Sequence, residues 1–163
     1  NLNKNIIIIL KNYKKEISKE NILKIRDFLK KKGNKFYLAN NVKLAHKLAL
    51  DGAYIPSFNR SNLHNCCKFR KNFKIIGSAH NIYEIRTKEK QNCEEIFISP
   101  LFETKYYNSF LGIHKFTNLA SITKRSVIAL GGINNNNFKK INRKFISGFA
   151  SISWLKKNGL NKI

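Results

Sequence analysis

Acidic residues are scarce in this chain of 163 residues, which has 9 aspartates and glutamates against 32 lysines and arginines. The resulting net charge of +23 favours nucleic acid or an anionic membrane as a partner. Lysine, asparagine and isoleucine are all heavily used, however, and their AT-rich codons explain much of the excess without any partner. The hydrophobic share of 42% excludes a disordered chain.

Cysteine, proline and long apolar runs are also scarce. Cys66, Cys67 and Cys93 form neither a disulfide framework nor a zinc-type spacing, so we expect a reduced, cytoplasmic protein. No apolar run approaches the ~20 residues of a membrane helix, and no signal-peptide pattern is visible. With two prolines and no linker, we expect a single domain over residues 1–163. Asn1 stands in place of an initiator Met, which favours a fragment or a processed chain.

The sequence alternates short β-branched or aromatic runs with amphipathic, lysine-rich segments. The runs recur at roughly 20-residue intervals, as in successive βα units, and their continuous hydrophobicity is typical of parallel strands covered on both faces. Strands are predicted at Asn5–Leu10, Lys35–Leu38, Ala53–Ile55, Lys74–Ser78, Glu95–Ser99, Ser126–Leu130 and Gly148–Ser153.

The intervening segments have helical periodicity. Helices are predicted over Glu20–Lys32 and Val42–Leu50, from Ile82 with Asn81 as its cap, and over Asn134–Asn142 with its leading asparagines as caps. The non-periodic stretch Thr104–His114 is expected to be a functional loop.

This alternation predicts an α/β fold, either an open doubly wound sheet or a closed (βα)8 TIM barrel. No GxGxxG motif follows the first strand, which weakens the dinucleotide-binding alternative. Seven strands are one short of the barrel's eight, and the missing unit would lie before Asn1.

In a barrel, ligands bind at the carboxyl ends of the strands. Gly131 and Gly132 follow one strand there, where backbone N–H groups and a following helix N-terminus form an anion site. Ser151 and Ser153 are two residues apart on the next strand and share a face. These residues and Gly148 are therefore predicted to bind phosphate, whereas the simpler alternative is a tight turn.

His80 is the only histidine at a strand's carboxyl end, where an imidazole can move a proton near neutral pH. A helix-capping or solvated histidine is the alternative. Asn40 and Asn59 also follow strands, but Mg²⁺ prefers carboxylates over neutral amides. The two aspartates, Asp27 and Asp51, lie elsewhere, so a magnesium–pyrophosphate site is poorly supported.

Five segments in register, from about Asn5 to Ser153, resemble the thiamine phosphate synthase / thiazole tautomerase (TenI) superfamily of (βα)8 barrels. They are LALDGAYI at Leu48–Ile55, IIGSAHNIYEI at Ile75–Ile85, EIFISPLFET at Glu95–Thr104, IALGGI at Ile128–Ile133, and Gly148–Ile152. The resemblance starts at the family's second strand, so it implies a barrel that lacks its first strand and most of its last helix.

The resemblance also implies roles for individual residues. It places Ser78 and His80 on an S-x-H motif whose histidine is the proposed acid/base of the tautomerase branch. The phosphate-binding part corresponds to Gly131, Gly132, Gly148, Ser151 and Ser153, and the substrate-binding part to Lys11, Thr104 and Lys105.

The departures from the family concern the synthase branch. Lys11 stands where the synthase has Arg, and Asn40 and Asn59 stand where it has its two metal-binding aspartates. We therefore expect an enzyme of thiamine biosynthesis that binds a thiazole phosphate and transfers a proton as a tautomerase does, with no metal or cofactor. Basic residues that replace the metal ion are an open alternative.

Two other functions remain. The first is thiamine phosphate synthase, which joins hydroxymethylpyrimidine pyrophosphate to thiazole phosphate, releases pyrophosphate and uses Mg²⁺. The second, from another class, is non-specific nucleic-acid binding through the basic surface. The main expectation includes a small-molecule partner and no membrane, and it leaves a homo-oligomer open.

Overall fold

Seven parallel strands form one sheet in which each strand pairs with its neighbour in sequence, in the order β1-β2-β3-β4-β5-β6-β7. The computed structural model describes residues 6–11, 17–104, 109–141 and 143–151. The strands are β1 (Ile7–Leu10), β2 (Lys35–Ala39), β3 (Gly52–Ile55), β4 (Lys74–Ala79), β5 (Glu95–Ile98), β6 (Ser126–Leu130) and β7 (Gly148–Ala150). All seven predicted strands are therefore present, although β7 ends at Ala150 and residues 152–153 lie outside the described part.

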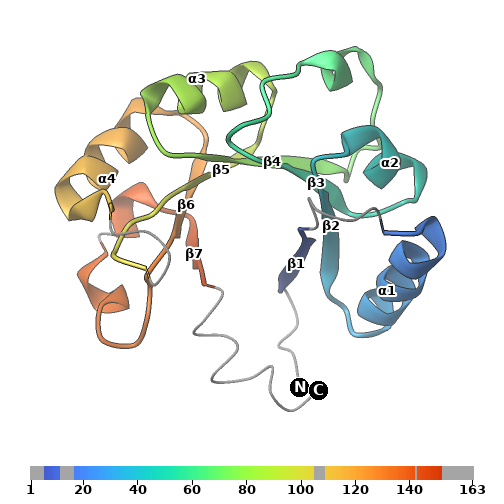
Figure 1. Cartoon of the computed structure of the whole chain (residues 1–163), viewed down its shortest axis with the longest axis horizontal. Helices are drawn as coiled ribbons and strands as arrows, with labels where there is room; N and C mark the ends of the chain where they lie inside the picture. The colour runs from blue at the N-terminus through green and yellow to red at the C-terminus, as the bar shows by residue number, and fades with distance from the viewer. Residues whose placement is uncertain (1–5, 12–16, 105–108, 142, 152–163) are drawn as a thin grey trace.

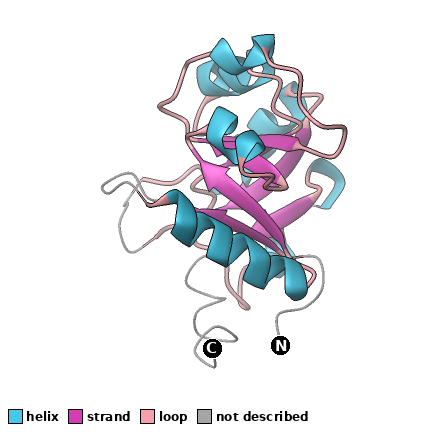
Figure 2. Ribbon diagram, turned by 90° about the vertical axis from the view of Figure 1, so that its right-hand side faces the viewer, coloured by secondary structure: helices cyan, strands magenta, loops and turns pink. Residues whose placement is uncertain are grey.

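The helices lie on the outside of a curled sheet, which has the shape of a half-barrel (Figure 1). Viewed from the side, they flank the strands (Figure 2). They are α1 (Lys19–Lys31), α2 (Val42–Lys47), α3 (Ile82–Lys90) and α4 (Gly112–Ile122), with short 3-10 turns η1 (Leu63–Cys66), η2 (Phe138–Lys140) and η3 (Arg143–Phe145). None of the described helices is long and apolar enough to cross a membrane.

The sequential strand order distinguishes between the two predicted architectures. A doubly wound sheet reverses its strand order and carries helices on both faces, whereas this sheet never reverses. The fold is thus α/β with a partial TIM-like barrel. Among the described residues β1 and β7 are not paired with each other. The absence of a first strand and a last helix stays a prediction.

Asparagine and serine side chains start three of the helices. The side-chain oxygens of Ser18, Asn41 and Asn81 accept hydrogen bonds from backbone N–H groups in the first turns of α1, α2 and α3. At α3 the bond runs from the Glu84 N–H to Asn81 Oδ1 over 3.0 Å. The predicted cap at Asn81 is confirmed.

Replacing Asn81 by alanine should lower the free energy of unfolding by about 1 kcal/mol, because an N–H group of the first turn loses its acceptor. Urea unfolding followed by circular dichroism measures the effect. Ser18→Ala is the matched control at α1, where the bond is longer, at 3.3 Å. An Asn81→Ala protein as stable as the unmodified chain would show that this cap contributes nothing.

The helix predicted over Asn134–Asn142 is wrong. Only the three residues of η2 are helical before residue 142, because asparagine side chains bind the nearby backbone instead of capping a helix. Asn137 Nδ2 donates to the Gly132 carbonyl over 2.8 Å, and Asn137 Oδ1 accepts from the Asn134 N–H over 2.9 Å. The run of asparagines therefore forms a closed turn. The predicted loop Thr104–His114 also ends early, because α4 begins at Gly112.

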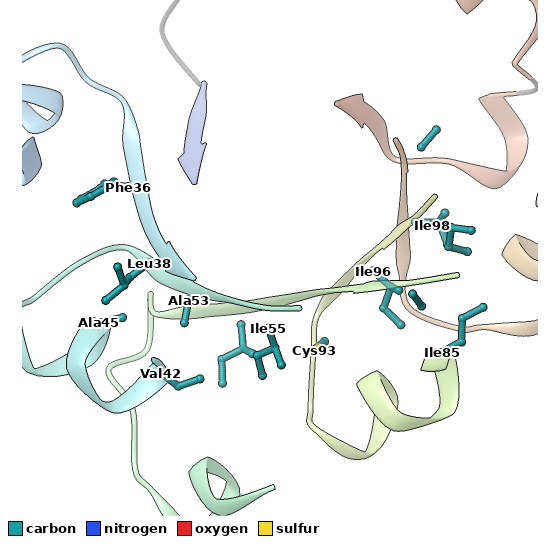
Figure 3. Close-up of a cluster of buried hydrophobic side chains, with 14 of the residues drawn as sticks. Phe36, Leu38, Val42, Ala45, Ala53, Ile55, Ile85, Cys93, Ile96 and Ile98 are labelled. Atoms are coloured by element: carbon teal, nitrogen blue, oxygen red, sulfur yellow. The ribbon is translucent and has the colours of Figure 1, made fainter. Parts of the chain in front are cut away.

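Two apolar layers hold the half-barrel together. The outer layer lies between sheet and helices, where strand residues such as Phe36, Ile55 and Ile96 meet Ala45 of α2 and Ile85 of α3 (Figure 3). The inner layer lies on the sheet's other face and is formed by Tyr37, Tyr54, Ile76 and Phe97. These side chains line the inner face, as they do in small barrels, whose ligands bind at a rim.

Candidate functional site

The carboxyl ends of the seven parallel strands meet at one rim of the half-barrel, the place where barrels of this kind bind ligands. Most of the predicted site residues lie at or just beyond these strand ends. They are Lys11 after β1, Asn40 after β2, Asn59 in the loop after β3, Ser78 and His80 at the end of β4, Thr104 after β5, Gly131 and Gly132 after β6, and Ser151 after β7. Lys105 and Ser153 lie outside the described residues.

The glycine turn after β6 (Gly131–Ile133) contains a run of backbone amides without acceptors among the described residues. Gly131 and Gly132 have φ angles of 99° and 67°, which turn the chain sharply at the strand end. In the part of the chain that the structure describes, no acceptor binds the N–H groups of Gly131, Gly132 or Ile133. Three such neighbouring donors at a rim suit an anion such as phosphate.

The loop after β5 packs tightly against this turn. Phe102 N–H donates to the Gly131 carbonyl over 3.1 Å, and Leu101 N–H donates to the Leu130 carbonyl over 2.9 Å. A Cβ atom on Gly132 would meet the carbonyl oxygen of Glu103 and would lie 2.7 Å from that of Phe102. Only glycine therefore fits here. Among the described residues no α-helix starts at the asparagine run, so the helix dipole expected to support the anion site is not found there.

Of the other predicted phosphate ligands, one lies at the glycine turn and one does not. Ser151 lies beside the glycine turn, where its hydroxyl donates to the Ile133 carbonyl over 3.3 Å. Gly148 starts β7 and pairs with Ile128, two positions before the pair of Leu130 with Ala150. Gly148 thus lies away from the rim, and the structure does not bring it to the glycine turn.

His80 forms a pair with Glu84, a residue that the sequence analysis did not select. The Glu84 carboxylate accepts from the His80 backbone N–H over 2.7 Å, and its distance to the ring nitrogen Nδ1 is 2.9 Å. The histidine side chain is 47% exposed. Ser78 is buried on the strand before it, and among the described residues its hydroxyl forms no hydrogen bond. Glu84 follows His80 by four residues and the Asn81 cap by three, and this spacing was the sequence signal that could have identified it.

Lys11 reaches over the inner apolar layer. Its ammonium donates to the Tyr54 hydroxyl over 3.1 Å and lies 4.2 Å from the centre of the Tyr54 ring. A positive charge is thereby held at the rim beside β3. A cleft of about 500 Å³, whose lining includes Arg60, Arg86 and Glu84, adds further cations next to the His80–Glu84 pair.

Asn40 and Asn59 are neighbours, as the resemblance implied. Asn59 Nδ2 donates to Asn40 Oδ1 over 2.7 Å, while Asn59 Oδ1 accepts from the Ser61 N–H over 2.8 Å. Both amide oxygens are therefore already engaged. Among the described residues no group of three His, Cys, Asp or Glu side chains could hold a metal ion. The residues present do not fit Mg²⁺, which prefers carboxylates.

Lys88 of α3 lies fully buried beneath the loop after β3 and was missed by the sequence analysis. Its ammonium donates to the carbonyl oxygens of Pro56 and Asn59 over 2.8 Å each and to Gln91 Oε1 over 2.7 Å. Burial lowers the pKa of Lys88 to about 8. A lysine in an amphipathic helix indicates a solvated face, so no sequence signal marked it.

A family model described as thiamine monophosphate synthase matches residues 4–155. A thiamine-phosphate synthase of Methanococcus maripaludis is 24% identical over 120 residues, which are 72% of this chain and 58% of that protein. One from Prochlorococcus marinus strain AS9601 is 28% identical over 144 residues, which are 86% of this chain and 37% of that protein. The aligned part of this chain thus spans 58% of the first relative's length and 37% of the second's.

Solved structures agree on the fold. The thiamine phosphate pyrophosphorylase from Pyrococcus furiosus superposes with a TM-score of 0.69 at 18% identity, covering 91% of this chain and 72% of that one. A structure described as native KDPGal gives a TM-score of 0.63 at 12% identity and covers 90% of this chain and 68% of that one. At these identities the superpositions establish the fold alone.

Proposed function

Because the chain belongs to the thiamine monophosphate synthase family, we propose that it joins hydroxymethylpyrimidine pyrophosphate to a thiazole phosphate and releases pyrophosphate. The relatives' names favour this reaction over the tautomerase reaction that the sequence analysis put first. The observation that carries the proposal is the glycine turn after β6, whose three backbone amides suit the thiazole phosphate.

In this reaction the thiazole ring nitrogen forms a bond to the methylene carbon of the pyrimidine. The bond from that carbon to the pyrophosphate oxygen breaks, and the pyrophosphate leaves with the electron pair. Fixed positive charge around the leaving group lowers the barrier, because charge develops there in the transition state. Lys11 supplies one such charge at the rim, and the strand ends hold the two substrates side by side.

A second function has one specific observation in its favour, the His80–Glu84 pair. With Nδ1 bonded to the carboxylate, the ring's Nε2 is left to exchange a proton with a substrate. This arrangement supports the tautomerase-like proton transfer, in which a proton leaves one position of the thiazole and returns at another.

One assay separates the two functions. We expect thiamine phosphate to form only when both substrates are present, and His80→Gln to reduce that rate less than about tenfold. If isomerisation of the thiazole is the activity, His80→Gln should lower its rate by about 10²-fold or more. His114→Gln, at an exposed position of α4, is the matched control. Isomerisation without any joining reaction would overturn the synthase proposal.

A further inference from the structure

The Lys88 ammonium is buried without an acidic partner. It is 0% exposed, and its three hydrogen bonds all go to neutral oxygens, those of Pro56, Asn59 and Gln91. None of the ion pairs among the described residues includes it. A buried charge without a counter-ion destabilises a protein, so its retention beneath a rim loop indicates a role for the charge.

The groups that contact the Lys88 ammonium carry no negative charge near neutral pH. Burial raises the pKa of the neighbouring Cys93 thiol to about 12, so this group stays neutral. The Glu84 carboxylate, whose charge favours protonated Lys88, makes no ion pair with it and is bonded to His80. The pKa of Lys88, about 8, keeps most of the ammonium protonated at pH 7.

Lys88 and Gln91 together hold the loop after β3. Gln91, also fully buried, donates from Nε2 to the carbonyls of Asn59 over 3.0 Å and Ser61 over 2.9 Å. The Asn59 carbonyl thus accepts from both side chains, while the Asn59 amide group binds Asn40 across the rim. The ammonium therefore contacts the backbone of one member of the Asn40–Asn59 pair.

The same pair occupies the position that the family resemblance assigns to two metal-binding aspartates. A divalent cation there would find neutral amides bound to each other and a like charge bonded to the backbone carbonyl of Asn59. Buried charges are screened much less than surface charges, so the lysine repels a cation and attracts an anion at this edge.

We propose that the Lys88 ammonium is a built-in cation that replaces a divalent metal ion at the Asn40–Asn59 edge and favours a pyrophosphate group there. Lys88 is a positioning residue, because it acts through the loop and through its field rather than by touching the ligand. The inference rests on the proposed function, since it concerns where the pyrophosphate of that reaction binds.

Calorimetric titration with inorganic pyrophosphate tests the proposal. In EDTA the unmodified chain should bind pyrophosphate, and added Mg²⁺ should tighten binding less than about threefold. Lys88→Met, which keeps the length of the side chain but removes its charge, should weaken binding in EDTA by about tenfold or more, whereas Lys88→Arg should retain most of the affinity. Lys47→Met removes one exposed charge from α2 and should leave the affinity unchanged.

Three results would overturn the inference. They are pyrophosphate binding that depends on Mg²⁺, equal affinities for the Lys88→Met and Lys47→Met proteins, and loss of affinity in Lys88→Arg equal to that in Lys88→Met. If Lys88→Met does not fold, the Mg²⁺ comparison on the unmodified chain decides.

Titration with inorganic phosphate separates this inference from the proposed function. Phosphate bound at the glycine turn without metal-free pyrophosphate binding refutes only the inference, whereas failure to bind either anion contradicts both.

Discussion

A Gly132→Ala protein is expected to lose binding of inorganic phosphate and about 3 kcal/mol of unfolding free energy. The added Cβ meets the carbonyl oxygen of Glu103 and lies 2.7 Å from that of Phe102. Both obstacles are backbone atoms, so the glycine turn and the loop after β5 have to separate. Overpacking typically costs 1–3 kcal/mol, and the φ angle of 67° adds roughly 1 kcal/mol for a residue with a Cβ.

Gly33 provides the matched control for this substitution. Its φ angle is 71°, close to that of Gly132, but no atom lies within 4 Å of the position that a Cβ would take. Gly33→Ala should therefore show the conformational cost alone, about 1 kcal/mol, with phosphate binding intact. Urea unfolding and phosphate titration of both proteins measure the two effects. Equal losses at the two glycines would mean that the contact between the loops contributes nothing.

The second large effect concerns Lys88 and pH. Its pKa is about 8 in the folded chain against an ordinary value of 10.5, so between these values the unfolded state binds more protons. The unfolding free energy should therefore rise with pH across this window, as the folded protein is relieved of a buried charge. Each pH unit between the two values contributes at most ~1.4 kcal/mol, which gives up to ~3 kcal/mol in all.

Lys88→Met isolates that contribution. Above pH 9 the surface lysines lose protons in both proteins alike, so their effect cancels in the difference between the two. Cys93, whose raised pKa keeps its thiol neutral in the folded chain, lowers the unfolding free energy of both proteins as the unfolded thiol ionises. The unfolding free energy of the unmodified chain minus that of Lys88→Met should thus increase from pH 8 to pH 10. A constant difference across this range would show that the ammonium carries no desolvation cost.

Local pattern was sufficient to predict the sheet but not all of the connections. Continuous apolar runs such as Lys74–Ser78 predict buried parallel strands, because only strands covered on both faces tolerate them. The helix predicted at the asparagine run is wrong because side chains that cap helices also close turns. Whether they cap or close a turn depends on partners such as the Gly132 carbonyl, which the local pattern does not reveal.

The positions of several candidate residues at the rim were predictable, because these residues directly follow a predicted strand. Gly131 and Gly132 and the Asn40–Asn59 pair lie at the rim as expected. Lys88 was not predictable, because the burial of this lysine depends on two carbonyl oxygens of a loop about 30 residues away in sequence, besides the side-chain oxygen of Gln91. Gly148 was misplaced because the alignment of a strand's end with its neighbour's end is set by register, which no local motif reveals.

The sequential order of the strands also determines how the chain can fold. Paired residues of neighbouring strands are separated by as few as 15 residues, between Tyr37 and Gly52, and by no more than 31, between Glu95 and Ser126. The entropy of loop closure grows slowly over such distances, and no pairing has to wait for a distant part of the chain. Each βα unit can therefore dock on the preceding strand as it leaves the ribosome, so that the sheet grows from β1 towards β7 in the order of synthesis.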